Sequence, residues 1–244
     1  NPEARRWFGG CYRPLIEQGI EGFWNDMNEP AIFYTPEGLE AASRLMREYM
    51  EDETGAVSMF QVREALTGLQ NHQDYYKAFY HQVDGRMVRH DKVHNLFGYN
   101  MTRAADEGFE RIAPDKRFLL FSRSSYIGMH RCGGIWTGDN KSWWSHILLN
   151  LQMMPALNMC GFLYTGADLG GFGDHTTRAL LLRWLAFGVF TPLMRNHSAI
   201  DTREQECYQF EGVEDFRHIV EVRYRLLPYL YSEYMKAALS DDLY

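Results

Sequence analysis

The chain has 244 residues, 45% of them hydrophobic and 23% charged, and its 32 acidic and 25 basic residues give a formal net charge of −7 at pH 7. Nucleic-acid-binding proteins usually carry a clustered basic excess, so this balance argues against a nucleic-acid partner. A transmembrane helix needs about 20 apolar residues in a row, and the longest apolar run here is too short, which argues against a membrane partner. The composition is that of a globular protein with a large core, and the length allows one α/β barrel or two smaller domains.

The ends of the chain and its cysteines suggest expectations about the parent polypeptide and its redox environment. The chain begins at Asn1 rather than at a methionine and ends within a predicted helix, 224–244, so we expect it to be a piece of a longer polypeptide. No basic-then-apolar signal segment opens it. The cysteines are widely scattered and form no C-x-x-C pair, which predicts reduced structural thiols and favours a cytoplasmic setting. They are Cys11, Cys132, Cys160 and Cys207.

Short apolar runs alternate with helical stretches along most of the chain. A continuous apolar run is typical of a strand that is buried on both faces, as in parallel sheets. The predicted strands are 19–25, 118–121, 162–165 and 189–194, and the predicted helices are 69–108 (interrupted near Asp84-Gly85), 142–158, 176–188 and 213–238. The acidic stretch 48–53 is interpreted as a solvated loop. Strand followed by helix, four times over, predicts an α/β fold with a parallel sheet, equivalent to about half of a (β/α)₈ barrel.

Polar residues and glycines follow the end of each predicted strand, at 25–30, 122–124, 166–168 and 195–197. In a (β/α)₈ barrel these ends carry the chemistry. Asp26 and Asp139 each lie close to a tryptophan, and two such carboxylic acids suit glycoside hydrolysis, in which one attacks the anomeric carbon and the other protonates the leaving oxygen. A single aspartate in such a place is commonly an Asx turn or a helix N-cap, and Asp139 precedes a predicted helix. The pair together favours catalysis.

Five segments, in order, resemble motifs of glycoside hydrolase family 31, the α-glucosidase family. The sequence WNDMNE at 24–29 resembles the nucleophile motif W-x-D-M-N-E of that family. Arg123-Ser124, Arg131 and WTGDN at 136–140 resemble its acid/base region. The remaining matches are YTGADLGGF at 164–172, the positions from Arg183-Trp184 to Arg195-Asn196-His197, and RYRLLPY at 223–229. The resemblance extends from about Gly19 to Tyr229. The five motifs in this order are together specific for the family, whereas Asn-Glu-Pro alone would be a weak signal.

The resemblance implies a fold. Members of the family have a full (β/α)₈ barrel behind an N-terminal β-sandwich, with further β domains after it. Residues 1–244 would then be part of a single catalytic barrel domain, a partial TIM barrel with roughly strands four to seven and their helices. The β-sandwich, the early strands with another sugar-binding aspartate, and the later β domains would lie outside this sequence.

The resemblance also assigns roles to the matching residues. Asp26 would be the nucleophile that forms a β-glycosyl ester, and Asp139 would be the general acid and then the base that activates water. Retention requires the two carboxyl groups to lie about 5–5.5 Å apart. The implied substrate-binding residues are Arg123 and His197, which hydrogen-bond sugar hydroxyls, then Trp24, Met27, Trp136 and Phe172, which line the pocket, and Asp168, for which we favour a structural role.

The function implied by the resemblance is that of a retaining α-glucosidase acting on α-linked glucose oligosaccharides of the maltose or isomaltose type. Two carboxylates suffice for the mechanism, so no cofactor or metal is implied. We expect the isolated chain to be weakly active or inactive, because the earlier strands would complete the sugar pocket. Its unpaired sheet edges and uncovered helix faces would favour self-association into a homo-oligomer.

Other functions fit parts of the pattern. A catalytically degenerate domain could bind a carbohydrate without turnover, although the presence of both carboxylates argues against it. Within the family, an α-xylosidase, an α-glucan lyase or a transglycosylase are the alternatives; WNDMNE favours glucose over xylose, and the products would separate the other two. Asn28-Glu29-Pro30 also resembles a β-glycosidase acid/base motif, which would make Glu29 the proton donor, but the downstream motifs favour the α-glucosidase interpretation.

One metal-binding look-alike occurs in the chain. His90 and His94 stand four residues apart, as in the zinc motif H-E-x-x-H. The position of the glutamate is taken by Asp91, and no third ligand is apparent, so the pattern does not predict a metal site.

Overall fold

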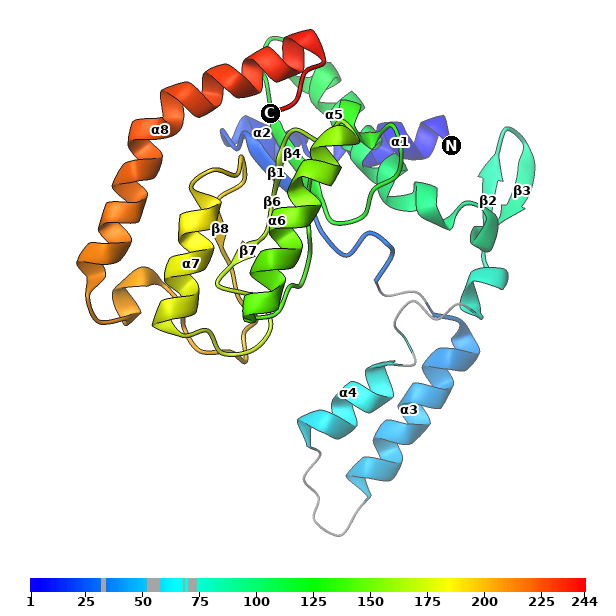
Figure 1. Cartoon of the computed structure of the whole chain (residues 1–244). Helices are drawn as coiled ribbons and strands as arrows, with labels where there is room; N and C mark the ends of the chain where they lie inside the picture. Colours follow the sequence, from blue (N-terminus) through cyan, green and yellow to red (C-terminus); the bar gives the residue numbers. More distant parts are fainter. Residues whose placement is uncertain (32–33, 52–57, 68, 70–73) are drawn as a thin grey trace. The chain divides into compact units, whose positions relative to one another are not determined.

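The computed structural model describes residues 1–31, 34–51, 58–67, 69 and 74–244, and Figure 1 shows the chain coloured from its N-terminus to its C-terminus. The chain forms two compact units. Unit 1 comprises Asn1–Glu21, Asn25–Arg117 and Ser124–Tyr126, and unit 2 comprises Gly22–Trp24, Phe118–Arg123 and Ile127–Tyr244. None of the helices among these described residues is both long and apolar enough to cross a membrane.

Unit 1 is mainly helical. Its elements are α1 (Pro2–Gly10), α2 (Arg13–Glu17), α3 (Pro36–Met50), α4 (Met59–Thr67), η1 (Tyr75–Lys77), β2 (Tyr80–Val83), β3 (Arg86–Arg89), η2 (His90–Lys92), η3 (His94–Leu96) and α5 (Phe97–Ile112). Helix α1 packs along α5, and α3 packs against α4. Side-chain caps explain two helix starts, because Asn1 accepts hydrogen bonds from backbone N–H groups of α1 and Thr35 accepts one from Gly38 N at 3.1 Å.

The helix predicted at 69–108 is largely wrong. Residues 70–73 lie outside the described residues, and the next stretch forms η1 and the antiparallel hairpin of β2 and β3. Asp84 and Gly85 both have positive φ angles, 47° and 77°, which is the conformation of a tight hairpin turn rather than of a helix break. Only the last part of the prediction is confirmed, as α5.

Helices α1, α2, α3 and α4 of unit 1 were not predicted, and α3 overlaps the acidic stretch 48–53. Helix α3 continues to Met50, so the start of that stretch is helical rather than a loop. Residues 52 and 53 lie outside the described residues. Leu39, Ala42, Met46 and Tyr49 recur at intervals of three and four residues along α3, so a helical period was present in the sequence and was overlooked.

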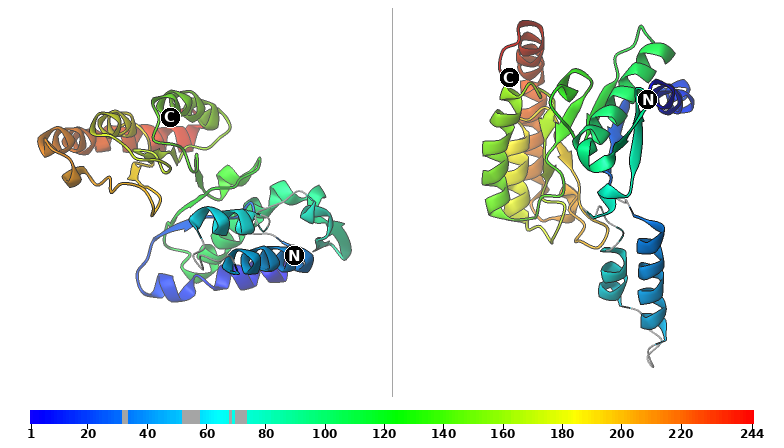
Figure 2. Two further views of the ribbon diagram at one scale, coloured as in Figure 1. Left: turned by 90° about the horizontal axis from the view of Figure 1, so that it is seen from below. Right: turned by 90° about the vertical axis from the view of Figure 1, so that its right-hand side faces the viewer.

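Unit 2 holds the parallel sheet. Its strands are β1 (Gly22–Asn25, of which Asn25 belongs to unit 1), β4 (Leu119–Ser122), β5 (Gly134–Trp136) and β6 (Thr165–Gly166), in that spatial order, with β7 (Asp168–Leu169) and β8 (Arg195–Asn196) as a second parallel pair. The helices are η4 (Met129–Arg131), α6 (Trp144–Met159), α7 (Arg178–Gly188), η5 (Cys207–Gln209) and α8 (Val213–Ser240). Helix α6 packs against α7 and α7 against α8, as a row of helices beside the strands (Figure 2). This is a partial barrel of the predicted α/β class.

The strands differ in detail from the prediction. The strands expected at 19–25 and 118–121 are confirmed with shifted ends, whereas β5 was not predicted and the strand expected at 162–165 starts only at Thr165. The strand expected at 189–194 is wrong. Val189 caps the end of α7, the following residues form turns, and β8 begins at Arg195. Val189 and Leu193 are both buried, so their apolar character reflects core packing, which an apolar run alone cannot distinguish from a strand.

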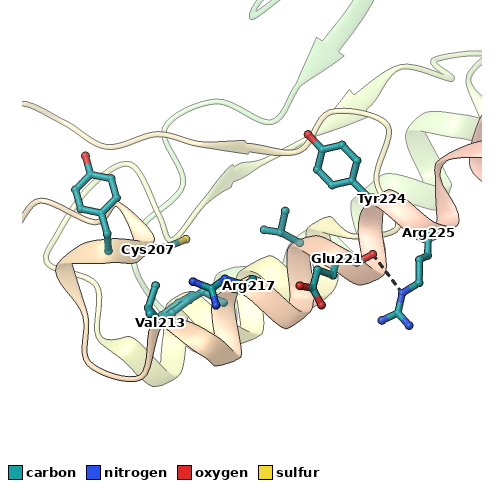
Figure 3. A pocket seen from close by; sticks show the side chains of 9 residues that line it. Cys207, Val213, Arg217, Glu221, Tyr224 and Arg225 are labelled. Carbon is teal, nitrogen blue, oxygen red and sulfur yellow. Dashed lines mark hydrogen bonds between the residues drawn. The ribbon is translucent and has the colours of Figure 1, made fainter.

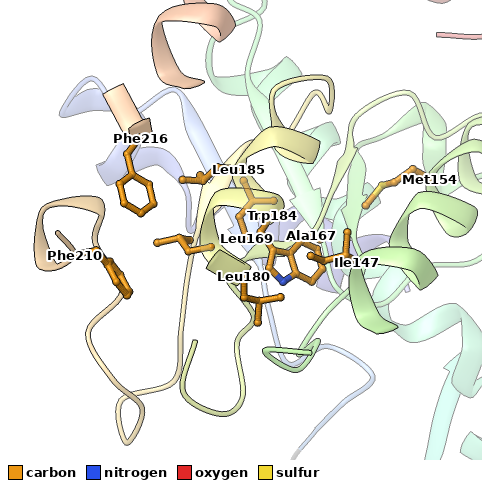
Figure 4. Packing of buried hydrophobic residues seen from close by; sticks show 10 residues of the cluster. Ile147, Met154, Ala167, Leu169, Leu180, Trp184, Leu185, Phe210 and Phe216 are labelled. Carbon is orange, nitrogen blue, oxygen red and sulfur yellow. The ribbon is translucent and has the colours of Figure 1, made fainter. Parts of the chain in front are cut away.

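The main core of unit 2 lies between its helices and the β7 strand. Trp184 and Leu181 of α7 and Leu169 of β7 are completely buried, and Phe216 of α8 joins them (Figure 4). Burying each such side chain contributes about 1.5–3 kcal/mol. The core therefore fixes the helices beside the strands whose ends carry the candidate site.

An open, largely apolar pocket of about 730 Å³ is lined by residues of η5 and of the first half of α8 (Figure 3). Six of its lining residues are labelled there: Cys207, Val213, Arg217, Glu221, Tyr224 and Arg225. None of the residues that the sequence assigns to sugar binding lines it.

A cluster of histidines lies beside the hairpin of unit 1. His90 is completely buried, and its Nδ1 lies 2.7 Å from Nε2 of His81. The ring of Tyr76 stacks on His94, with centroids 4.7 Å apart, and contacts His90 edge-on. Burial first, and then the nearby His81 and His94 rings, lower the pKa of His90 to about 4, and burial also lowers the pKa of His81. His90 and His81 therefore favour their neutral forms.

This cluster predicts a loss of stability in acid. The pKa of a histidine in an unfolded chain is about 6.5, so below that pH the unfolded state takes up a proton that folded His90 binds only near pH 4. The contribution is present above pH 6.5 and is lost as the pH falls towards 4. We expect the free energy of unfolding in urea to drop by about 2 kcal/mol more between pH 7 and pH 4.5 in the wild type than in His90→Gln. The same substitution at exposed His218 should keep the wild-type slope; equal slopes in all three proteins would contradict the prediction.

Candidate active site

The loop after β5 carries the first predicted catalytic carboxylate. Asp139 has a half-exposed side chain, and its Oδ1 lies 3.6 Å from Nη1 of Arg123, which directly follows β4. The two predicted residues therefore meet at the carboxyl ends of neighbouring strands. Helix α6 begins at Trp144 with Trp143 as its N-cap residue and without a side-chain cap, so Asp139 is not the N-cap that its position before a predicted helix suggested.

Asn140 holds this loop in place. Its side chain donates from Nδ2 to Asp168 O at 2.9 Å and accepts from Asp168 N at 3.1 Å, while its backbone oxygen accepts from Phe172 N at 2.7 Å. Gly171, with a φ of 94°, lies so close to Ser142 that an added Cβ would be 2.4 Å from Ser142 N. The loop of Asp139 and the loop after β7 thus form one closely packed support.

The predicted aromatic residues of unit 2 form a continuous wall. The Trp24 ring at the end of β1 contacts Trp136 at the end of β5 and His197 after β8, each edge-to-face with centroids 5.5 Å apart. Phe172 extends the wall, with its ring 5.3 Å from that of His197. Trp136 is 2% exposed and Trp24 is 41% exposed. The buried Trp136 ring therefore supports the Trp24 ring, which remains accessible to a ligand. An accessible indole on a rigid support is the kind of surface on which a sugar ring stacks.

A buried ion pair packs against this wall. Asp168 is completely buried, and its Oδ1 accepts a hydrogen bond of 2.5 Å from Nη2 of Arg195. The guanidinium carbon of Arg195 lies 4.5 Å from the Trp24 ring centroid and 5.4 Å from that of Trp136. The carboxylate of Asp168 is thus paired inside the protein, and the structural role that the sequence favoured for it stays a prediction.

Asp26 and Met27 lie in unit 1, directly after β1. Asp26 Oδ1 accepts a hydrogen bond from Met27 N at 2.7 Å, and Met27 has a positive φ of 56°. The next residue, Asn28, is completely buried and its Oδ1 accepts from Ser124 N at 3.1 Å, which anchors the turn. The expected spacing between the carboxyl groups of Asp26 and Asp139 stays a prediction.

Two residues of this site were missed at the sequence level, Asn140 and Arg195. Both lie within quoted motifs, beside Asp139 and two positions before His197, but neither was singled out. Their partner Asp168 is far away in the chain, so only the three-dimensional structure brings the three side chains together. Within the part of the chain that the structure describes, no three histidine, cysteine, aspartate or glutamate side chains are grouped so that they could hold a metal ion.

Comparison with known proteins identifies relatives of the whole chain. Residues 1–233 match the model of the glycosyl hydrolases family 31 TIM-barrel domain. Alpha-glucosidase 2 of Bacillus thermoamyloliquefaciens is 32% identical over 97% of this chain and 26% of its own length, and a probable glucan 1,3-alpha-glucosidase of Arabidopsis thaliana is 33% identical over 97% and 22%. This chain therefore spans about a quarter of the length of these curated relatives.

Solved structures give the same result. A family 31 dextranase of Flavobacterium johnsoniae in complex with glucose is 26% identical, with a TM-score of 0.69 over 97% of this chain and 26% of that one. A family 31 alpha-glucosidase of Bacteroides thetaiotaomicron is 28% identical, with a TM-score of 0.69 over 96% and 32%. Because the family model covers nearly the whole sequence and the folds agree, this chain belongs to glycoside hydrolase family 31 and is a partial TIM barrel of that family.

Proposed function

We propose that residues 1–244 are part of a single catalytic barrel domain of a retaining α-glucosidase that hydrolyses terminal α-linked glucose from oligosaccharides. The observation that carries the proposal is the arrangement around Asp139. A half-exposed carboxylate on a braced loop faces Arg123, and an accessible tryptophan lies in the aromatic wall at the ends of the neighbouring strands of the same unit. The relatives that bear the name alpha-glucosidase support the same substrate class.

In the first step, the Asp26 carboxylate attacks the anomeric carbon, and the bond from that carbon to the leaving oxygen breaks. Asp139 gives its proton to the departing oxygen, so the aglycone leaves as a neutral alcohol. The product of this step is a β-glucosyl ester on Asp26. Because Asp139 is now ionised, it can serve as a base in the second step.

In the second step, Asp139 removes a proton from water, and the resulting oxygen attacks the anomeric carbon from the face that the aglycone left. The ester bond breaks and Asp26 regains its carboxylate, so glucose is released with its original α configuration. Arg123 and His197 would hydrogen-bond the sugar hydroxyls, and the sugar would lie against Trp24, Met27 and Phe172. The two carboxyl groups supply both the nucleophile and the proton, so the mechanism needs no metal or cofactor.

A slow substrate tests the proposal directly. A 5-fluoro-α-glucosyl fluoride slows breakdown of the glycosyl-enzyme more than its formation, so the ester should accumulate. In the full-length protein that contains this chain, we expect one added fluoroglucosyl group by intact-mass spectrometry, located on Asp26 by peptide mapping. The isolated chain, treated in parallel, reports whether this part alone is competent.

Three results would contradict the proposal. An adduct on Glu29 would overturn the choice of nucleophile. Glucose binding without any adduct or turnover in the full-length protein would favour the carbohydrate-binding alternative. Products other than glucose from maltose, an anhydro-sugar or a longer oligosaccharide, would assign the chain to a lyase or a transglycosylase.

A further inference from the structure

Arg195 is held in an unusual environment at the start of β8. Its side chain is 18% exposed, and its charge is paired with the buried carboxylate of Asp168. Within the described residues, its Nε and Nη1 atoms are buried and have no hydrogen-bond partner. Burying an ion pair costs free energy that the pairing alone often does not recover, so the Arg195–Asp168 pair by itself is weak evidence for a stabilising role.

The remaining contacts of Arg195 are with aromatic rings. Its guanidinium carbon lies within 6 Å of three centroids: 4.5 Å from Trp24, 5.4 Å from Trp136 and 5.7 Å from Phe121. At these distances a cation is attracted to the face of a ring, and most strongly so to tryptophan. Trp24 is the most exposed of the three, so it has the most freedom to change rotamer without such a contact.

Asp168 links Arg195 to the loop of Asp139. The side chain of Asp168 accepts from Arg195, and its backbone N–H and C=O groups are both bound by the side chain of Asn140, the residue after Asp139. The buried Asp168 therefore connects Arg195, which contacts the aromatic wall, with Asn140, which holds the loop of the predicted acid/base.

We propose that Arg195 is a positioning residue for the sugar pocket: anchored by Asp168, its guanidinium holds the Trp24 and Trp136 rings in the orientation that receives the sugar. This inference rests on the proposed function. A stacking ring contacts the sugar in the ground state and in the transition state alike, so losing its orientation weakens binding uniformly and raises KM more than it lowers kcat.

The experiment compares Arg195→Met with Arg223→Met in the full-length protein. Arg223 is also partly buried in unit 2, but it donates to Val189 O at 2.6 Å and to Pro192 O at 3.2 Å, and no ring contact of its guanidinium is recorded among the described residues. Active sites are counted with the fluorinated glucosyl fluoride, and kcat and KM for maltose are expressed per active site. The inhibition constant of glucose gives a second measure of binding.

For Arg195→Met we expect KM and the inhibition constant of glucose to rise on the order of tenfold, equal to about 1.4 kcal/mol, with kcat per active site within a factor of about three. Arg223→Met should lose thermal stability but keep the wild-type KM. A merely structural role for Arg195 would reduce the number of active sites and leave KM unchanged, and this result would overturn the inference.

Arg195→Lys keeps the test decisive if the methionine variant does not fold. A lysine retains the charge beside Asp168, but its ammonium group cannot lie flat over a ring. We expect a KM between those of the wild type and Arg195→Met; a wild-type KM would overturn the inference while leaving the proposed function intact. No turnover and no glucose binding in the wild type would overturn the proposed function and the inference with it.

Discussion

Asp139→Asn is expected to slow maltose hydrolysis by the full-length protein by about 10²–10⁴-fold, the usual contribution of a general acid. Asparagine preserves the size of the side chain but cannot give a proton to the departing sugar oxygen. Formation of the glycosyl-enzyme from α-glucosyl fluoride should be much less affected, because fluoride leaves without a proton. Comparing the two substrates in single-turnover measurements separates the loss of proton donation from a general loss of the site.

Two further measurements sharpen this result. Azide needs no base to become a nucleophile, so it should restore breakdown of the glycosyl-enzyme in Asp139→Asn and give α-glucosyl azide, the product of two inversions. Asp174→Asn is the matched control, because Asp174 is a similarly exposed carboxylate that pairs with Lys141 at 3.8 Å. Its activity should stay close to that of the wild type. Equal losses for maltose and for α-glucosyl fluoride in Asp139→Asn would remove Asp139 from the acid/base role.

The helices of unit 2 were the most predictable part of the fold. Helices α6, α7 and α8 begin and end within about two residues of the predicted bounds, because each combines a long apolar pattern with turns or glycines at its ends. The strands were less predictable. β5 has only three residues, and its ladder partners are Phe121, Ser122, Thr165 and Gly166, so its identity depends on neighbours that are distant in the sequence.

The candidate site was predictable where its residues follow a strand and fall in a motif. Trp24, Trp136, Phe172 and His197 belong to one aromatic wall, and Arg123 faces Asp139, while their roles towards a sugar stay predictions. The supporting residues were not predictable in the same way. Asn140 acts on the backbone of Asp168 and Arg195 acts on its carboxylate, and a local pattern does not contain such long-range hydrogen bonds.

In the hairpin of unit 1, the turn signal was recognised in the sequence but the structure on either side of it was predicted wrongly. Asp84-Gly85 was recognised as an interruption, but the flanking residues were interpreted as helical. The alternation of partly buried and exposed residues in β2 and β3 is weak, and the buried contacts of His90 form only when η2 folds back on η1. Tertiary packing, rather than the local sequence pattern, therefore determines the strand conformation of these residues.

Removing the proposed nucleophile should have the largest effect of all. We expect Asp26→Ala in the full-length protein to reduce kcat on the order of 10⁴–10⁶-fold, the range for central members of covalent catalytic machinery. The substitution leaves Asp139 able to donate a proton and opens a space on the face from which Asp26 would attack. Azide can enter that space and displace fluoride from α-glucosyl fluoride in a single step, so the expected product is β-glucosyl azide.

The configuration of the azide product then identifies each carboxylate by its chemistry rather than by the size of a rate loss. A single inversion in Asp26→Ala and a double inversion in Asp139→Asn require the nucleophile at residue 26 and the acid/base at residue 139. Glu29→Ala is the control for the neighbouring carboxylate, and it should give neither azide product. If β-glucosyl azide came from Glu29→Ala and not from Asp26→Ala, the nucleophile would be Glu29, and the β-face of the sugar would lie against that side chain instead.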